Sequence, residues 1–261
     1  MNMVVCIKQV PDTNEIRIDP QTGNLIREGV PSIVNPDDKH AVEAAVSLKE
    51  KHGGKVTVLT MGPAQAEEAL RECLAMGADE AILLTDRAFS GADTWATSYT
   101  LGCAIRKIGE FDLILCGRQA LDGNTAQVGP QIAEFLELPQ VTYVQAVEVS
   151  GQTLKARRAL EDGYEVLETK LPALLTVTKD MNVPRTPPID AIMNAYQAEI
   201  TTWTAADLPV DADKIGLKGS PTRIRKAYTP ELKSRQVEII KGNIEEAVNT
   251  LVARLESRQL V

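Results

Sequence analysis

One stretch of the sequence, residues 117–129, combines small, polar and cationic residues in the pattern of a phosphate-binding turn. It reads GRQALDGNTAQVG, follows the apolar run 112–116 and leads into a helical pattern over 126–136. Open α/β sheets bind ligands at the carboxyl ends of their strands, and the unpaired amides that open a helix suit a phosphate. We therefore predict a nucleotide cradle, in which the polar side chains contact a sugar or pyrophosphate. Its predicted binding residues are Gly117, Arg118, Gln119, Ala120, Asp122, Gly123, Asn124, Thr125, Ala126, Gln127 and Val128.

Strand-like and helical patterns alternate through the first half of the chain and would position this cradle. Apolar runs at 3–8, 55–60, 81–84 and 112–116 indicate buried strands, and each precedes a helical pattern. Such alternation predicts a parallel sheet with right-handed crossovers. The turns after these strands then gather at one sheet edge, where Cys6, Asn35 and Met61 are expected to join the cradle.

The pattern changes after residue 140. Four strand-like runs, 141–149, 153–160, 164–169 and 173–178, are separated by tight-turn residues and predict an antiparallel extension of the same sheet. From residue 198 onward the chain is too polar to suggest an independent core, and only 244–255 reads as an amphipathic helix. We expect one α/β domain over 1–197 and a C-terminal arm over 198–261 that needs a partner surface.

The chemistry that the sequence lacks narrows its function. The dinucleotide fingerprint, the Walker loop and the nucleophile elbow are all absent, and the two histidines and four cysteines form no metal-ligand cluster. A net charge of −8 argues against a nucleic-acid partner, and no apolar run is long enough to span a bilayer. Unpaired core thiols fit a reduced, cytoplasmic setting. We expect no catalytic side chain and no metal, but a cofactor that carries its own chemistry.

Several of these residues also have a plain structural interpretation. Asn35 could only cap the helix that Pro36 opens, Thr94 and Thr97 could be ordinary residues of a first helical turn, and Asp122 could satisfy turn amides. The case for a binding site depends on the convergence of four polar turns on one sheet edge.

A proline-rich loop at 180–193 has two interpretations as well. Its prolines keep the chain extended, and Ile189, Ile192 and Met193 then follow at helical spacing. These three side chains could belong to the core of a connector, or they could be an apolar anchor that docks onto another protein.

Taken together, the motifs resemble those of the β subunit of electron transfer flavoproteins. The resemblance rests on VCIKQVPD at 5–12, NPDD at 35–38, TMGPAQ at 60–65, MGAD at 76–79 and the cradle. It implies a Rossmann-like domain that binds an adenine nucleotide, paired with an α subunit that holds an electron-carrying FAD. It further implies that 180–193 is a recognition loop, with Ile189 as the anchor for a partner dehydrogenase, and that the C-terminal segment embraces the α subunit.

The family divides on the nucleotide of the β subunit, which is a structural AMP in simple carriers and a second FAD in bifurcating members. The cradle and GADTWATS at 91–98 look like the bifurcating group. Thr94 and Thr97 share a helix face and could contact an isoalloxazine that AMP lacks. The resemblance then implies NADH as electron donor, an acyl-CoA dehydrogenase-type partner, and ferredoxin or flavodoxin as the low-potential acceptor. Arg118 would face a phosphate or a reduced flavin. AMP in the β site is the alternative, and a nucleotide-sensing regulator without redox chemistry is a second one.

Overall fold

The computed structural model describes residues 1–12, 31–223, 225 and 239–261. The chain forms two compact units, Met1–Lys226 and Ala227–Val261. The first unit runs past residue 198, where the arm was expected to begin, because β11 (Thr201–Trp203) pairs with strand β5 of the sheet. The second unit contains α7 (Ile244–Ser257), the predicted amphipathic helix, which is capped by Asn243.

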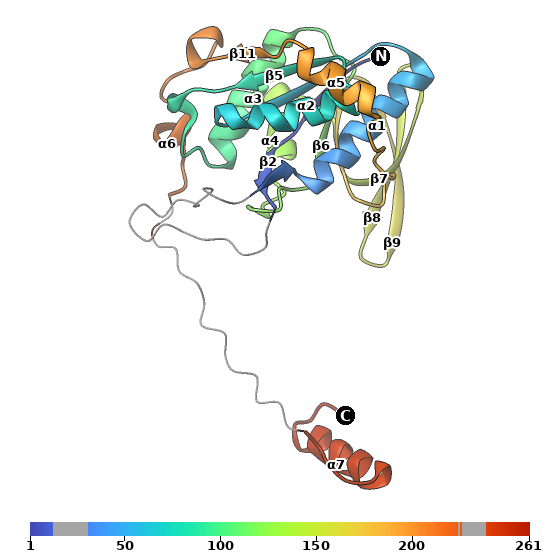
Figure 1. The fold of residues 1–261 in the computed structure, drawn as a ribbon. Coiled ribbons are helices and arrows are strands. Elements are labelled where there is room, and N and C mark those ends of the chain that lie inside the picture. Colours follow the sequence, from blue (N-terminus) through green and yellow to red (C-terminus); the bar gives the residue numbers. More distant parts are fainter. Residues whose placement is uncertain (13–30, 224, 226–238) are drawn as a thin grey trace. The chain divides into compact units, whose positions relative to one another are not determined.

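A nine-stranded sheet is the centre of the first unit (Figure 1). Its strand order is β11-β5-β4-β1-β6-β10-β7-β8-β9, and the short strands β2 and β3 pair separately. The remaining strands are β1 (Asn2–Cys6), β2 (Gln9–Pro11), β3 (Ser32–Val34), β4 (Lys55–Met61), β5 (Glu80–Leu84), β6 (Leu113–Gly117), β7 (Gln140–Ser150), β8 (Thr153–Leu160), β9 (Gly163–Lys170) and β10 (Ala173–Val177).

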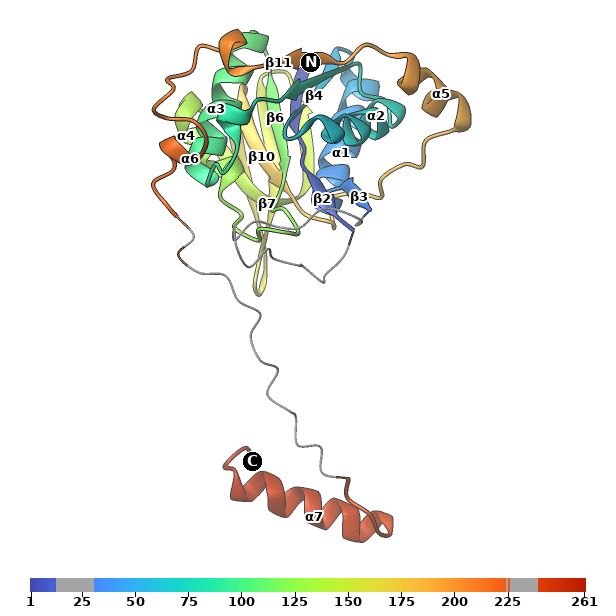
Figure 2. The same ribbon diagram turned by 60° about the vertical axis from the view of Figure 1, so that its left-hand side comes forward.

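Helices cover both faces of this sheet, which gives three layers (Figure 2). Side chains of α1 and α2 pack in the core on one face, and those of α3 and α4 pack on the other. The longer helices are α1 (Pro36–His52), α2 (Glu67–Ala75), α3 (Thr94–Ile108), α4 (Val128–Leu136) and α5 (Ile189–Gln197). The short ones are η1 (Ala64–Ala66), η2 (Arg87–Phe89), η3 (Ala205–Asp207) and α6 (Gly216–Gly219).

The parallel α/β fold predicted from the alternating pattern is confirmed. Strands β11, β5, β4, β1, β6, β10 and β7 run parallel to one another, and the central ones are buried along almost their whole length. Burial on both faces explains their continuous apolar runs. Within the described residues, no helix has the length and apolar character needed to cross a bilayer.

The position of β10 corrects one prediction. The run at 173–178 was expected in the antiparallel extension, but β10 lies between β6 and β7 and is parallel to both. All five of its residues are buried, as an interior parallel strand requires. The antiparallel part consists of β7, β8 and β9 alone. The sequence pattern could not show this, because a short buried run looks the same in either pairing.

Strand β1 marks the point at which the strand order reverses, the switch point of the sheet. From β1 the chain passes through α1 to β4 on one side, whereas from β5 it passes through α3 to β6 on the other side of β1. Crossovers that lie on opposite faces leave a crevice beyond the carboxyl ends of the two strands at such a point. The cradle segment (residues 117–129) directly follows β6 and therefore lies at this crevice.

Candidate functional site at the switch point

Three predicted binding residues are the last residues of adjacent strands. Cys6 ends β1, Met61 ends β4 and Gly117 ends β6, so the parallel sheet brings them to one edge. The prediction that the polar turns converge on this edge is confirmed by the strand pairing. What the edge binds must be argued from the side chains around it.

Asn35 precedes α1 and is almost entirely buried, with 1% of its surface exposed. Its side-chain Nδ2 donates to the carbonyl of Gln119 at 2.9 Å, and its Oδ1 accepts from the amide of Leu121 at 2.9 Å. It makes no side-chain capping bond to α1. Asn35 therefore holds the cradle backbone in place and is more than a helix cap.

Lys8 makes a second link to the cradle and was missing from the predicted binding set. Its Nζ lies 2.7 Å and 2.8 Å from the two carboxylate oxygens of Asp122. The carboxylate of Asp122 is nearly buried, because its side chain is only 11% exposed. The sequence does carry a signal for Lys8, because this lysine follows the end of a buried strand by two residues and that strand ends at the crevice.

Asp38, in the first turn of α1, joins the ends of β1 and β6. Its Oδ2 accepts from the amide of Lys8 at 2.7 Å and its Oδ1 accepts from the amide of Gly117 at 3.1 Å. Burial raises the pKa of this carboxyl to about 7, although the hydrogen bonds that it accepts oppose the rise. A buried carboxyl thus links the ends of β1 and β6 at the switch point, and burial disfavours its ionised form.

Gly117 permits this close approach. A Cβ built on Gly117 would lie 2.2 Å from Oδ1 of Asp38 and 2.7 Å from the backbone nitrogen of the same residue. Such distances are far below van der Waals contact, so no other residue fits without movement of α1 or β6.

The cradle backbone is left-handed at two positions. Asn124 and Ala126 have φ angles of 50° and 53°. Asn tolerates this region, whereas Ala is strained in it. The amides of Gly123 and Asn124 both bond to the carbonyl of Ala120, at 3.3 Å and 2.8 Å, which fixes the turn. Strain of this kind persists where the surrounding structure enforces it, and it is concentrated at binding sites.

The start of α3 adjoins the cradle. The hydroxyl of Thr94 donates to the side-chain carbonyl of Gln127 at 3.0 Å, and Thr97 is half-buried one turn further along the same helix face. Asp93 caps the helix by accepting from the amide of Ala96 at 3.0 Å. The sequence prediction that this turn and the cradle share one edge is confirmed.

Arg118 follows β6 and faces two groups. Its Nε lies 3.4 Å from Oδ2 of Asp37, and its guanidinium carbon lies 6.0 Å from the centre of the Tyr143 ring. Its backbone amide donates to the carbonyl of Val177, the last residue of β10, at 2.8 Å. The cation is therefore partly neutralised by Asp37 and half-exposed at the edge of the site.

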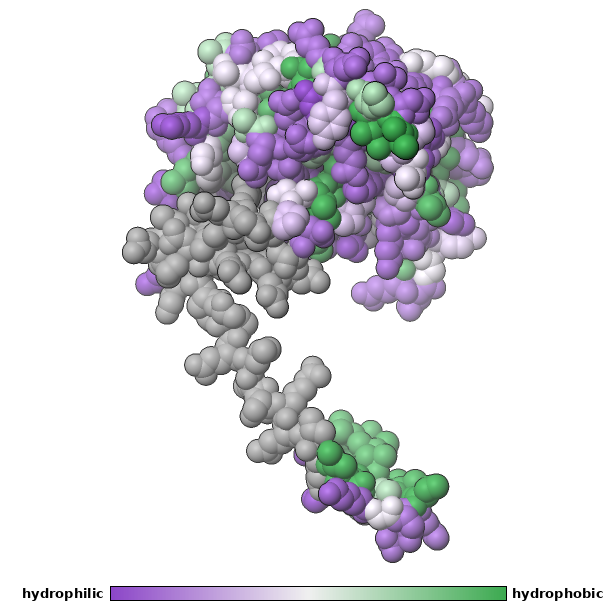
Figure 3. Space-filling model, in the orientation of Figure 1, coloured by the Kyte–Doolittle hydropathy of each residue, from purple (hydrophilic) through white to green (hydrophobic). Residues whose placement is uncertain are grey.

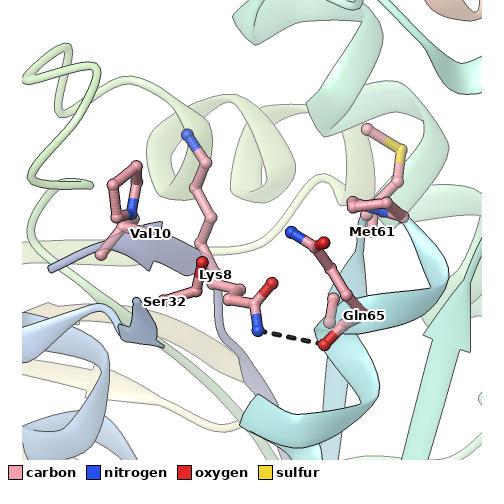
Figure 4. Close-up of a pocket in the computed structure, with 10 residues that line it drawn as sticks. Lys8, Val10, Ser32, Met61 and Gln65 are labelled. Carbon is pink, nitrogen blue, oxygen red and sulfur yellow. Dashed lines mark hydrogen bonds between the residues drawn. The ribbon is translucent and has the colours of Figure 1, made fainter. Parts of the chain in front are cut away.

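A small hollow opens beside β1 and β4 (Figure 4). Lys8 and Met61 extend from its two sides, and Gln9 donates to the backbone carbonyl of Gln65 at 3.0 Å across it. Its lining consists of Lys8, Gln9, Val10, Pro11, Ser32, Met61, Gly62, Pro63, Gln65 and Ala66. The lining mixes apolar and polar side chains with one cation, that of Lys8, so it offers contacts both to a heteroaromatic base or sugar and to an anionic group.

The thiols near the site are buried in the core. Cys6 and Cys116 are register neighbours on β1 and β6, and both are buried. The hydrogen bond with Cys6 and burial raise the pKa of the Cys116 thiol well above its ordinary value. In the described parts of the chain, no group of three or more His, Cys, Asp or Glu side chains is arranged to hold a metal ion.

The predicted docking residues lie on α5, away from the core. Ile189 is 78% exposed, Met193 is 61% exposed and Ile192 is also exposed, so the interpretation of these three as core residues is wrong for this chain. Ala195 is the one buried residue of α5, and the helix packs against α2. Figure 3 shows an apolar patch on the surface at the place of α5.

Hydrogen bonds and ion pairs pin the loop before α5 to α1. Arg185 donates to both carboxylate oxygens of Glu43, at 2.8 Å and 3.0 Å, and to Glu50 at 2.6 Å. Asn182 donates to the carbonyl of His40 at 2.9 Å. Burial would raise the pKa of Glu43, but the bonds from Arg185 outweigh it and hold this pKa below its ordinary value.

Arg185→Met is expected to lower the free energy of unfolding by about 2 kcal/mol, because it leaves the buried Glu43 carboxylate without its partner while Arg185 itself is partly solvated. Glu50→Gln, which alters the exposed partner, should change stability little. Since the pKa of Glu43 is lowered in the folded state, the difference between wild type and R185M should begin to shrink below about pH 4.5 and should be lost as the pH falls through that lowered pKa. Urea unfolding at pH 7 and at several pH values below 4.5 tests both statements, and equal effects of the two substitutions would contradict them.

Comparison with known proteins agrees with this architecture. The electron transfer flavoprotein domain matches residues 22–208. The electron transfer flavoprotein subunit β of Thermoanaerobacterium thermosaccharolyticum is 62% identical, and that of Clostridium acetobutylicum is 57% identical, each over the full length of both chains. The caffeyl-CoA reductase-Etf complex subunit CarD of Acetobacterium woodii is 51% identical, again over both full lengths. The chain therefore belongs to the electron transfer flavoprotein family, as a β subunit that works in electron transfer with an α-subunit partner.

Proposed function

We propose that the β site binds FAD and that the heterodimer carries out flavin-based electron bifurcation. The observation that supports this most directly is the hydrogen bond between Thr94 and Gln127. It joins the first turn of α3 to the cradle, so the polar surface continues beyond the part that an adenosine and its phosphates would occupy. When bound, FAD would take two electrons from NADH and pass one through the α-subunit FAD and the other to ferredoxin or flavodoxin.

The residues present suit the adenosine and pyrophosphate of this cofactor. The first amides of α4 have no partner within the helix and lie at its positive end. The left-handed turn at Asn124 and Ala126 is fixed in advance, so that binding need not order it. Cys6 and Met61 border the position of the base, while Asn35 holds the cradle at Gln119 and Leu121.

Thr94 and Thr97 would contact the isoalloxazine. Thr94 already has an acceptor in Gln127, which orients its hydroxyl toward the cradle. Arg118 would stabilise negative charge on the phosphate or on the reduced ring, and its contact with Asp37 limits how far its own side chain can move. The chain thereby supplies position and electrostatics, and no side chain need act as an acid or base.

The exposed face of α5 would dock the partner enzyme. Ile189, Ile192 and Met193 present apolar surface there, and Arg185 fixes the loop that leads to it. The name of CarD places that relative in a caffeyl-CoA reductase complex, which supports an acyl-CoA dehydrogenase-type partner for this chain. The C-terminal arm would embrace the α subunit, since α7 has apolar side chains but no buried residue. We place the complex in the cytoplasm.

The nucleotide content of the purified heterodimer tests this proposal. Release by denaturation, followed by chromatography, should give two FAD and no AMP per dimer. One FAD and one AMP would show a simple carrier with a structural nucleotide in the β subunit, and an absence of flavin would favour a regulator of the same fold. Thr94→Val combined with Thr97→Val should also shift the potential of the β flavin, while Thr100→Val, on the same helix but fully buried, should not.

A further inference from the structure

The backbone of Lys8 is fixed on both sides. Its amide donates to Oδ2 of Asp38 at 2.7 Å, and its carbonyl accepts from the amide of Asn35 at 2.8 Å. The backbone of Lys8 is therefore held at the sheet edge, and its side chain leaves that edge from a defined point. The side chain reaches the cradle, where Asp122 holds its ammonium group.

This side chain stands between the hollow and the cradle. Figure 4 shows that it extends along the wall of the hollow, away from the contact between Gln9 and Gln65. The Lys8 side chain is 43% exposed, whereas that of Asp122 is 11% exposed. The ammonium group is thus open to solvent on one side, although both oxygens of its partner are engaged with it.

An ammonium group has three donors, and two of its contacts are to a single carboxylate. A phosphate that approached from the open side would meet a cation that is already fixed in position and has one donor beyond its two contacts with Asp122. Arg118, a second cation among the described residues at this edge, lies beside Asp37, with its guanidinium carbon 6.0 Å from the centre of the Tyr143 ring. Asp122 and an incoming phosphate would then compete for the charge of Lys8.

We propose that Lys8 is the residue by which this site discriminates a nucleotide phosphate from an uncharged nucleoside, and that Asp122 sets the strength of this discrimination. The proposal rests on the nucleotide site proposed above and adds its specificity. Lys8 acts through a direct contact with the phosphate, and Asp122 acts by holding Lys8 in place and by weakening its attraction for anions.

The test measures dissociation constants for AMP and for adenosine on the heterodimer after its β-site nucleotide has been removed. AMP carries the phosphate next to the adenosine, and adenosine lacks it, so the ratio of the two constants isolates the phosphate. Lys8→Met should reduce the preference for AMP about tenfold, as expected for one lost charged hydrogen bond. Lys8→Arg should restore most of it, and Asp122→Asn should increase it.

Lys49→Met is the matched control. Lys49 also makes a two-oxygen ion pair with an aspartate, Asp79, at 2.8 Å and 2.9 Å, but at the far end of α1. This variant should leave both dissociation constants unchanged. If Lys8→Met weakens AMP and adenosine equally, Lys8 only positions the cradle and the proposal fails while the nucleotide site stands. If wild type binds neither AMP nor adenosine, the proposed nucleotide site itself is wrong.

Discussion

Gly117→Ala is expected to lower the free energy of unfolding by about 3 kcal/mol and to abolish nucleotide binding in the β subunit. The added methyl would lie 2.2 Å from Oδ1 of Asp38 and 2.7 Å from the backbone carbonyl carbon of Asp37. Neither atom can give way easily, because Asp38 is buried and hydrogen-bonded while Asp37 belongs to the first turn of α1. Relief requires α1 to move away from β6, which would pull Asn35 out of its contacts with the cradle.

Gly123→Ala is the control for this substitution. Gly123 lies in the same cradle, but a Cβ there would meet nothing within 4 Å. Its stability should stay within about 0.5 kcal/mol of wild type, as for most surface substitutions. Urea unfolding of both variants makes the comparison. Similar stabilities for the two would show that α1 yields easily, and the tight contact at the switch point would then have no energetic importance.

The second large effect concerns the pH dependence that Asp38 confers. The pKa of its carboxyl rises from an ordinary 3.8 to about 7 in the folded protein, mainly because of burial. The folded state therefore holds this proton more strongly than the unfolded state. Between about pH 4 and pH 7 stability should fall as the pH rises, by about 1.4 kcal/mol per pH unit from this group, and the contribution should level off above pH 7.

Asp38→Asn should remove this slope. The amide resembles the protonated carboxyl, but it can accept only one of the two backbone hydrogen bonds, so the variant should also show an offset that does not change with pH. Subtracting the variant from wild type at each pH between 5 and 8 cancels the other titrating groups. Cys73 and Cys116 stay protonated over this range, because their pKa values are raised. Parallel curves for wild type and variant would contradict the buried titration of Asp38.

The sheet edge could be predicted from the sequence, because each of its strands is a short apolar run and each following turn is polar. Periodicity alone then places Cys6, Met61 and Gly117 on the same edge, as strand pairing confirms. The roles of the polar residues could not be predicted in the same way. Asn35 was expected to touch a ligand or cap a helix, yet both of its side-chain groups bond to the cradle backbone.

The reason is that a polar side chain in a turn can form its hydrogen bonds equally well with other groups of the protein or with a ligand. Which of these occurs depends on what lies within about 3 Å, and this distance is set by elements far apart in the chain. Lys8 and Asp122 are separated by 114 residues, and no local pattern relates them. Gly117 could be identified as part of a turn, but its contact with Asp38 exists only because α1 begins directly against β6.

The place of β10 has a consequence for the geometry of electron hand-over. This strand pairs with the cradle strand β6, and residues 178–188 connect it directly to the exposed helix α5. Three prolines restrict the backbone of this connection, and the bonds of Arg185 and Asn182 attach it to α1. This connection therefore fixes the distance between the proposed cofactor site and the proposed docking face. Insertions at the β8–β9 turn should leave that distance unchanged, whereas one added residue within 178–188 should alter it while both surfaces keep their own structure.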